Sequence, residues 1–230
     1  MKEISKAKLK DLLSLYVVTD AKLSLGRPEQ LVAGLAAAGG AGVIQLRDKE
    51  ASTRLLYEKA LVIKKELTGK AIFIVNDRLD VAQAVDADGV HLGQEDLPAA
   101  VARRILGTKK IIGVSVGNVE EAIRAEDDGA DYLGASAVFA TPTKTDARAI
   151  GLKGLEAICR AVSIPVVGIG GINKSNAWQI IAAGAAGVAV VSAVVSASDV
   201  TLAAAELLAL IKEKPAGYCS GKLRREPISR

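Results

Sequence analysis

The sequence is poor in aromatic and sulfur-containing residues. Only 3% of its residues are aromatic, although half are hydrophobic, so the core must be built from Val, Ile, Leu and Ala. Such a composition suits parallel strands that are buried on both faces. Two cysteines, Cys159 and Cys219, are too few for a disulfide framework or a cysteine-based metal site. We therefore expect both to be structural or incidental.

The sequence also lacks a continuous apolar run of about twenty residues and a stretch typical of a secretory signal. We expect a cytoplasmic protein without a membrane partner. The net charge of +4 is concentrated in residues 215–230, which hold four basic residues and one acidic residue. Because the rest of the chain is close to neutral, a nucleic-acid partner is not expected. Any preference for anions must be local.

One sequence pattern recurs along the chain: a helix C-terminus rich in Gly or Asp, followed directly by an apolar strand. Its copies lie at residues 39–47, 85–93, 128–134 and 183–190. Other strand-like runs lie at 15–19, 71–75, 111–114 and 164–168. Eight strands at intervals of roughly 20 to 30 residues, with helical patterns between them, predict a closed (β/α)8 TIM barrel.

No linker or shift in composition divides the body of the chain. We predict a single-domain barrel over residues 1–213, in which residues 1–13 form a short lead-in that covers the barrel floor. The apolar run 187–194 is expected to be the last strand, and 199–212 the last helix. Residues 214–230 form a basic tail without periodicity, which we expect to be disordered.

Polar residues follow the second predicted strand, where a barrel carries its chemistry. The strand ends in Gln45, and alternation places Arg47 and Lys49 on the same side as that amide. Arginine binds a phosphate through two N–H groups, and lysine adds a mobile positive charge. The spacing therefore predicts an anion site in the barrel mouth, the alternative being a solvated loop.

Carboxylates follow the third and fourth strands, at Asp77 and Asp96. Each is placed to be a helix N-cap. Adjacent barrel strands would also bring both onto one rim, where two carboxylates beside an anion site suit a Mg²⁺ shared with a diphosphate. Both interpretations stay open. His91, the only histidine, lies inside a strand and is expected to orient a neighbour or to pack rather than to act as a base.

A second anion site is predicted where the seventh and eighth strands end. The run 164–172 contains Gly170 and Gly171 near its end, and Val191 and Ser192 lie near the end of the next apolar run. Glycines let backbone N–H groups approach an anion closely, and these two strands form the usual phosphate site of the barrel fold.

Hydroxyl groups and a lysine surround a proline after the sixth strand. Thr141, Thr143 and Lys144 flank Pro142, which restrains the loop. We expect this loop to order over a ligand, with the threonines at the second anion site and Lys144 at the first. The physical interpretation is two anionic substrates joined at one barrel mouth.

These motifs jointly resemble the thiamine-phosphate synthase family, and they occur in the family's order over nearly the whole body. The matching pieces are Gln45-x-Arg47-x-Lys49, Asn76-Asp77-Arg78, His91-Leu92-Gly93-Gln94-x-Asp96, Gly113-Val114-Ser115, Thr141-Pro142-Thr143-Lys144, Gly168-Ile169-Gly170-Gly171-Ile172 and Val190-Val191-Ser192.

The resemblance implies a transferase that joins a pyrimidine diphosphate to a thiazole phosphate with Mg²⁺ as cofactor, by a dissociative substitution in which diphosphate leaves first. Arg47, Lys49, Ser115 and Lys144 would stabilise the leaving group. The implied pyrimidine diphosphate site is Gln45, Arg47, Lys49, Asn76, Ser115 and Lys144; the implied Mg²⁺ ligands are Asp77 and Asp96; the implied thiazole phosphate site is Thr141, Thr143, Gly171, Val191 and Ser192.

The sequence departs from the family pattern at one point and leaves rival functions open. Residues 136–141, Ser-Ala-Val-Phe-Ala-Thr, lack both prolines that the family often carries there. A thiazole tautomerase of the same fold would need a histidine after the fifth strand, and residues 116–118 supply none. A sugar-phosphate isomerase would need an acid/base pair. A non-catalytic thiamine-precursor binding protein stays open, as does a homo-oligomer.

Overall fold

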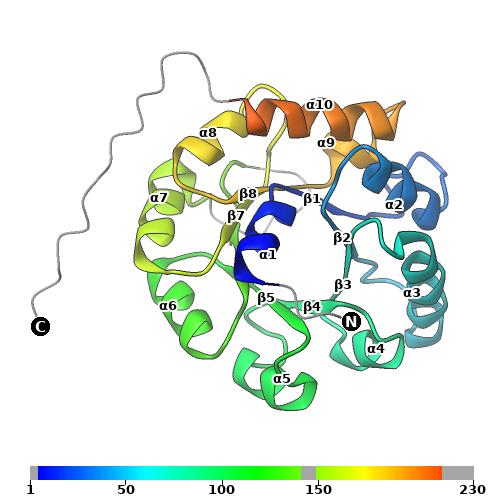
Figure 1. Ribbon diagram of the computed structural model, residues 1–230, viewed down its shortest axis with the longest axis horizontal. Helices are drawn as coiled ribbons and strands as arrows, with labels where there is room; N and C mark the ends of the chain where they lie inside the picture. The colour runs from blue at the N-terminus through cyan, green and yellow to red at the C-terminus, as the bar shows by residue number, and fades with distance from the viewer. Residues whose placement is uncertain (1–4, 141–148, 214–230) are drawn as a thin grey trace, which may run out of the picture.

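The computed structural model describes residues 5–140 and 149–213, and within them eight parallel strands close into a barrel (Figure 1). The strands follow one another in sequence order, and β1 pairs with both β2 and β8. The predicted TIM barrel is therefore confirmed. The strands are β1 (Leu15–Val18), β2 (Val43–Leu46), β3 (Ile72–Asn76), β4 (Gly89–Leu92), β5 (Ile111–Val116), β6 (Tyr132–Ser136), β7 (Val166–Ile169) and β8 (Gly187–Val190).

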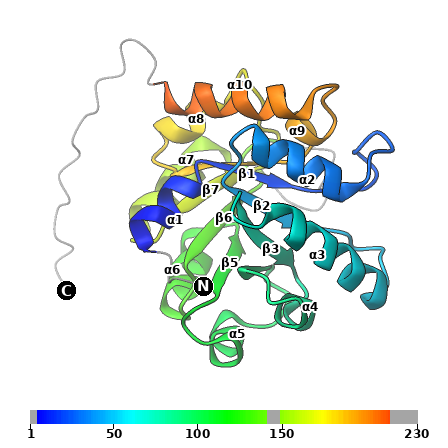
Figure 2. The same cartoon turned by 45° about the vertical axis from the view of Figure 1, so that its right-hand side comes forward.

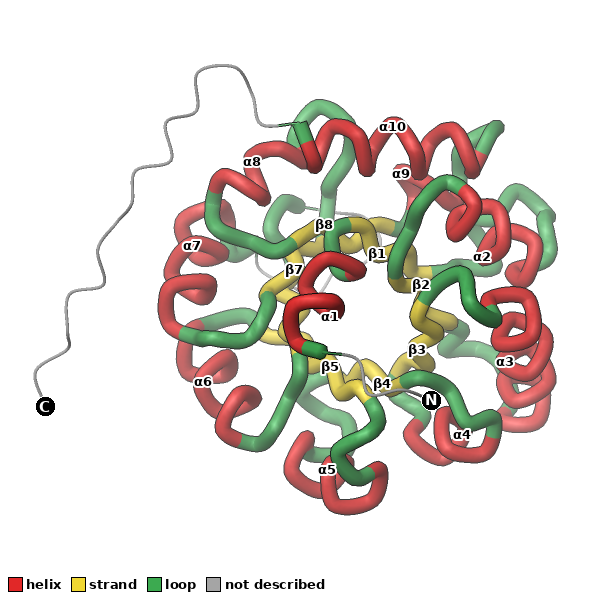
Figure 3. Tube along the Cα trace, viewed as in Figure 1, coloured by secondary structure: helices red, strands yellow, loops and turns green. Residues whose placement is uncertain are grey.

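Helices surround the strands on the outside, as the tube in Figure 3 shows. Among them, α2 packs against both α3 and α10 (Figures 1 and 2). None of the helices in the described part of the chain is long and apolar enough to span a bilayer. The helices are α1 (Lys6–Leu12), α2 (Glu29–Ala38), α3 (Thr53–Leu67), α4 (Leu79–Ala84), α5 (Ala99–Leu106), α6 (Val119–Asp127), α7 (Gly151–Ala161), α8 (Ala177–Ala182), α9 (Ser192–Val195) and α10 (Val200–Lys212).

Helix α1 lies across the barrel centre in Figures 1 and 3 and closes the floor, as predicted for the lead-in. The Ser5 side chain accepts a hydrogen bond from the backbone N–H of Lys8 and so caps its first turn. Leu9 and Leu13 are buried in the barrel interior. The floor is therefore apolar, and the polar residues of the interior lie above it.

Side chains that point into the barrel form a core separate from the larger one beneath the helices. Tyr16, Val43 and Tyr132 belong to this interior core. Because side chains alternate along a strand, Gln45 points inward as Val43 does. Alternation thus carries a polar layer to the carboxyl end of the barrel, where a ligand can reach it.

The prediction that residues 187–194 form the last strand is wrong for the second half of this run. Strand β8 ends at Val190, and residues Ser192–Val195 form helix α9. Val194 and Val195 are fully buried in that helix. A short apolar run is compatible with a buried helix as well as with a buried strand, so periodicity alone did not distinguish the two. The predicted tail, 214–230, lies outside the described residues.

Candidate active site

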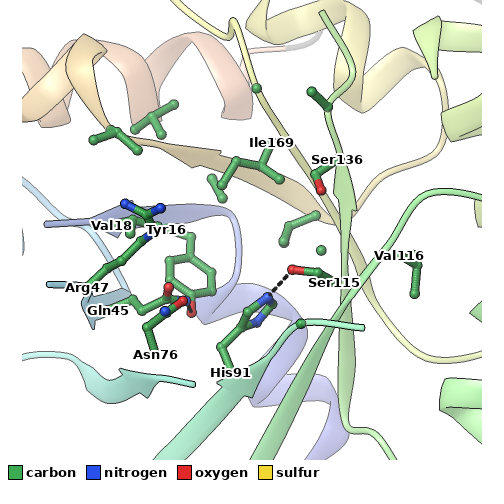
Figure 4. A pocket seen from close by; sticks show the side chains of 18 of the residues that line it. Tyr16, Val18, Gln45, Arg47, Asn76, His91, Ser115, Val116, Ser136 and Ile169 are labelled. Carbon is green, nitrogen blue, oxygen red and sulfur yellow. Dashed lines mark hydrogen bonds between the residues drawn. The ribbon is translucent and has the colours of Figure 1, made fainter. Parts of the chain in front are cut away.

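A cavity of about 780 Å³ opens at the carboxyl ends of the strands (Figure 4). Three predicted site residues, Thr141, Thr143 and Lys144, lie outside the described residues. The other predicted residues all line this one cavity, although their individual roles remain predictions. They are Gln45, Arg47, Lys49, Asn76, Asp77, Asp96, Ser115, Gly171, Val191 and Ser192.

Two cations enter the cavity from the loop after β2. The backbone N–H of Arg47 donates to the Thr19 hydroxyl at 3.2 Å, and its guanidinium lies 3.9 Å from the carboxylate of Asp20. Lys49 Nζ lies 3.4 Å from Asp77 Oδ2. The start of the loop is therefore tied to the end of β1, and its cations face groups on both neighbouring strands.

A partly buried ion-pair cluster holds this loop from behind. Lys59 on α3 contacts Asp48 at 2.6 Å and Glu29 at 2.5 Å, and Glu29 is only 6% exposed. Asp48 lies between Arg47 and Lys49 in the chain and also accepts two backbone N–H groups of its own loop. Burial alone would raise the pKa of Asp48, but Lys59 and these N–H groups outweigh it and lower that pKa. The cluster therefore keeps the Asp48 carboxylate ionised and holds the loop in place.

We expect Lys59→Met to weaken the binding of inorganic diphosphate about tenfold and to lower the melting temperature. Methionine preserves much of the apolar stem but leaves the buried Glu29 carboxylate without its cation, and an uncompensated buried charge is destabilising. Isothermal titration and thermal unfolding measure both effects. Lys65→Met, at an exposed position of the same helix, is the control. Equal diphosphate affinity in the two variants would show that the cluster does not position the loop.

Asp77 and Asp96 form a pair of carboxylates opposite these cations. Asp77 has a left-handed backbone, with φ of +61°, and its N–H donates to the carbonyl oxygen of His91 at 2.8 Å. Burial raises the pKa of Asp77, the neighbouring Asp96 carboxylate raises it further, and Lys49 partly offsets both. An uncommon backbone conformation and two adjacent like charges point to a functional arrangement.

The helix-cap interpretation of these carboxylates is wrong. Arg78 occupies the N-cap position of α4, and Pro98 that of α5. Asp96 Oδ2 instead accepts the N–H of Gly93 at 2.6 Å within its own loop. No group of three or more metal-binding side chains occurs among the described residues. Two carboxylates fit Mg²⁺, which takes its other oxygens from phosphates and water.

A glycine turn forms the opposite wall of the cavity. Gly170 and Gly171 have φ of +104° and +65°, which favour glycine. A Cβ placed on Gly171 would lie 2.8 Å from Phe139 Cβ and 2.9 Å from the carbonyl oxygen of Ala140. The side chain of Asn176 donates to the Gly171 carbonyl at 2.9 Å and holds the turn. Only glycine fits this place without displacing its neighbours.

The short helix α9 begins beside this turn with Ser192. At its other end, Arg27 donates to the carbonyl oxygen of Val195 at 2.8 Å, and Ser196 donates to that of Leu23 at 3.1 Å. A cation at the helix C-terminus is favourable for the helix dipole. Sequence reasoning missed Arg27 because its partners lie about 170 residues away in the chain.

Two buried tyrosines, one of which lines the cavity, were also missed. Tyr16 and Tyr132 link Gln45 to His91 through hydrogen bonds, and His91 contacts the Ser115 hydroxyl at 2.9 Å. The last contact agrees with the expectation that His91 orients a neighbour. The scarcity of aromatic residues could have drawn attention to tyrosines in two strands that end at the site.

Comparison with known proteins gives consistent results over most of the chain. The profile of the family described as thiamine monophosphate synthase matches residues 15–194. The thiamine-phosphate synthase of Chloroflexus aurantiacus is 58% identical over 200 residues, covering 86% of this chain and 92% of that protein. That of Moorella thermoacetica is 60% identical over 197 residues, covering 84% and 93%.

Solved structures give the same result. The thiamine phosphate pyrophosphorylase from Pyrococcus furiosus superposes with a TM-score of 0.83 at 49% identity, covering 90% of this chain and 99% of that one. A 3-hexulose-6-phosphate synthase superposes with a TM-score of 0.63 at 22% identity, covering 86% and 99%. The second likeness shows the barrel fold alone, whereas in the first 49% of the aligned residues are also identical.

Proposed function

The chain belongs to the thiamine monophosphate synthase family, and from this membership we propose the reaction at its cavity. It joins 4-amino-2-methyl-5-hydroxymethylpyrimidine diphosphate to 4-methyl-5-(2-hydroxyethyl)thiazole phosphate and yields thiamine phosphate and diphosphate. The observation that carries this proposal is one cavity with two cations and a carboxylate pair on one side and a glycine turn on the other. Two phosphorylated substrates of unequal charge fit such a cavity.

The diphosphate is bound on the side of the β2 loop. Arg47 and Lys49 supply positive charge to its oxygens, and Lys144, which follows β6 in the sequence, supplies a third cation. Asp77 and Asp96 would hold Mg²⁺, and the ion would supply positive charge to the departing diphosphate. Lys49, which lies 3.4 Å from Asp77, is within reach of the same diphosphate.

The chemistry needs no protein nucleophile. The electron-rich aminopyrimidine supports positive charge on its exocyclic methylene, so diphosphate departs first and the thiazole nitrogen captures the cation. Gln45 and Asn76 orient the pyrimidine ring. Water would compete for the cation, and the apolar wall formed by Val167, Ile169 and Ala189 limits its access. The protein's tasks are thus leaving-group stabilisation and alignment.

The thiazole phosphate is anchored across the cavity. The backbone at Gly171 and Val191 and the hydroxyl of Ser192 bind its phosphate, and the hydroxyls of Thr141 and Thr143 add to this site. This anchor places the thiazole nitrogen toward the methylene that carries the charge. Both substrates are charged phosphate esters, which do not cross membranes readily. We therefore place the reaction in the cytoplasm.

Product formation from the two substrates tests the proposal. With both substrates and Mg²⁺, we expect thiamine phosphate in an amount equal to the diphosphate released, and no product when either substrate or the metal is omitted. A tautomerase would alter a thiazole phosphate without releasing diphosphate, and the relatives' names do not favour that alternative. Binding of both substrates without turnover would instead support a non-catalytic binding protein.

A further inference from the structure

A continuous chain of hydrogen bonds crosses the barrel interior along the cavity wall. Gln45 Nε2 lies 2.5 Å from the Tyr16 hydroxyl, which lies 2.8 Å from that of Tyr132. The Tyr132 hydroxyl lies 2.9 Å from His91 Nδ1, and His91 Nε2 lies 2.9 Å from Ser115 Oγ. Figure 4 shows the histidine–serine link and the side chains of Gln45 and Tyr16 beside it. We name these five residues the interior chain.

The barrel makes room for this chain with glycines. A Cβ placed on Gly113 would lie 2.1 Å from the ring of Tyr132, and one on Gly134 would lie 3.1 Å from the ring of His91. Tyr16 and Tyr132 are 1% and 0% exposed. Gln45, Tyr16, His91 and Ser115 line the cavity, whereas Tyr132 does not. The two halves of the interior chain are therefore connected through a residue that does not line the cavity.

The interior chain has a direction. Burial raises the pKa of both tyrosines, so each is a neutral phenol with a single hydrogen. The Gln45 amide donates to Tyr16, which leaves the Tyr16 hydrogen for Tyr132 and the Tyr132 hydrogen for His91 Nδ1. A neutral imidazole that accepts at Nδ1 carries its hydrogen on Nε2. It then donates to Ser115 Oγ, whose own hydrogen is left to point into the cavity.

We propose that the interior chain fixes Ser115 as a hydrogen-bond donor to an anionic oxygen bound in the cavity. Tyr16, Tyr132 and His91 are then positioning residues that act through Ser115. The inference rests on the proposed function for the identity of the acceptor, which is an oxygen of the departing diphosphate. Without the interior chain, the serine hydroxyl would rotate and donate to the imidazole instead. With the interior chain in place, the serine donor is oriented before the substrate arrives.

The tautomer of His91 tests this direction without any turnover, because His91 is the only histidine in the sequence. In protein labelled with ¹⁵N-histidine, we expect NMR to show a protonated Nε2 and an unprotonated Nδ1. Gln45→Glu replaces a donor with a carboxylate that only accepts, so the chain should reverse and protonate Nδ1. A wild-type imidazole protonated at Nδ1, alone or together with Nε2, would overturn the proposal.

A second variant shows whether the tyrosines transmit this change. Tyr132→Phe removes both hydrogen bonds of the middle link and keeps the ring. In that background, we expect Gln45→Glu to leave the His91 tautomer unchanged. An equal tautomer change with and without the Tyr132 hydroxyl would overturn the proposal. Tyr16→Phe breaks the chain one link earlier and replaces Tyr132→Phe if that variant does not fold.

Kinetics show whether the orientation matters for the reaction. We expect Tyr132→Phe to lower kcat about tenfold, the size of one lost hydrogen bond, with little change in KM for the thiazole phosphate. In a Ser115→Ala background, the same substitution should have no further effect, since the two residues act as a unit. Tyr57→Phe, at an exposed position on α3, is the matched control. Additive losses would overturn the proposal, and a complete lack of wild-type turnover would fault the proposed function while leaving the tautomer result valid.

Discussion

Asp77→Asn will lower turnover about 10²- to 10³-fold and will raise the melting temperature at neutral pH. The turnover falls because one of two proposed Mg²⁺ ligands loses its charge. The melting temperature rises because the folded protein disfavours this carboxylate: burial and Asp96 raise its pKa above the ordinary value of 3.8. The folded state is therefore less stable wherever Asp77 is ionised, and the gain in the Asn variant should shrink as the pH falls through that raised pKa. Turnover against Mg²⁺ concentration and thermal unfolding against pH measure the two effects.

Asp86→Asn is the matched control, because Asp86 also has a left-handed backbone, with φ of +53°. Its exposed carboxylate pairs with Lys110 and Lys64, which lower its pKa to about 2. The sign is thus opposite: this carboxylate stabilises the folded state above its ordinary pKa, and that stabilisation is lost as the pH falls toward about 2. We expect a lower melting temperature at neutral pH and unchanged turnover. An unchanged Mg²⁺ titration in Asp77→Asn would reject the metal assignment.

Gly171→Ala will raise KM for the thiazole phosphate about 100-fold and will leave KM for the pyrimidine diphosphate nearly unchanged. The added Cβ meets Phe139 Cβ at 2.8 Å and the Ala140 carbonyl oxygen at 2.9 Å, so the turn must shift. A shifted turn misplaces the proposed phosphate anchor on one side of the cavity only. Steady-state kinetics with each substrate varied in turn measure the difference.

Gly69→Ala separates this steric effect from backbone strain. Gly69 has φ of +74°, and a Cβ placed there would meet nothing within 4 Å. We expect a lower melting temperature from the left-handed backbone, with neither KM changed. If both values of KM rise equally in Gly171→Ala, the turn does not bind the thiazole phosphate selectively.

The site residues at strand ends were predictable from the sequence because their positions follow from strand periodicity. Gln45, Arg47 and Lys49 alternate at the end of one strand, and Asp77 and Asp96 follow the next two. In a barrel, consecutive strands are neighbours, so residues near in sequence order come together on the rim. All five residues line the cavity, and their roles stay predictions.

Contacts that depend on the closed barrel were not predictable. Tyr16 and Tyr132 are 116 residues apart and meet only because β1 and β6 face each other across the interior. Lys59 reaches Glu29 through the packing of α3 against α2. Neither motif spacing nor hydrophobic periodicity encodes such distances. The helical turn of α9 was missed for a different reason, since an apolar run does not distinguish a buried helix from a buried strand.

A single-turnover experiment tests the central claim most directly. The protein, in excess over the pyrimidine diphosphate, is mixed with thiazole phosphate and Mg²⁺, and the reaction is quenched at successive times. We predict that thiamine phosphate and diphosphate appear together, one for one, and that neither forms without Mg²⁺. Diphosphate-free conversion of the thiazole phosphate, or tight binding of both substrates without either product, would contradict the assignment of this cavity as a site that joins them.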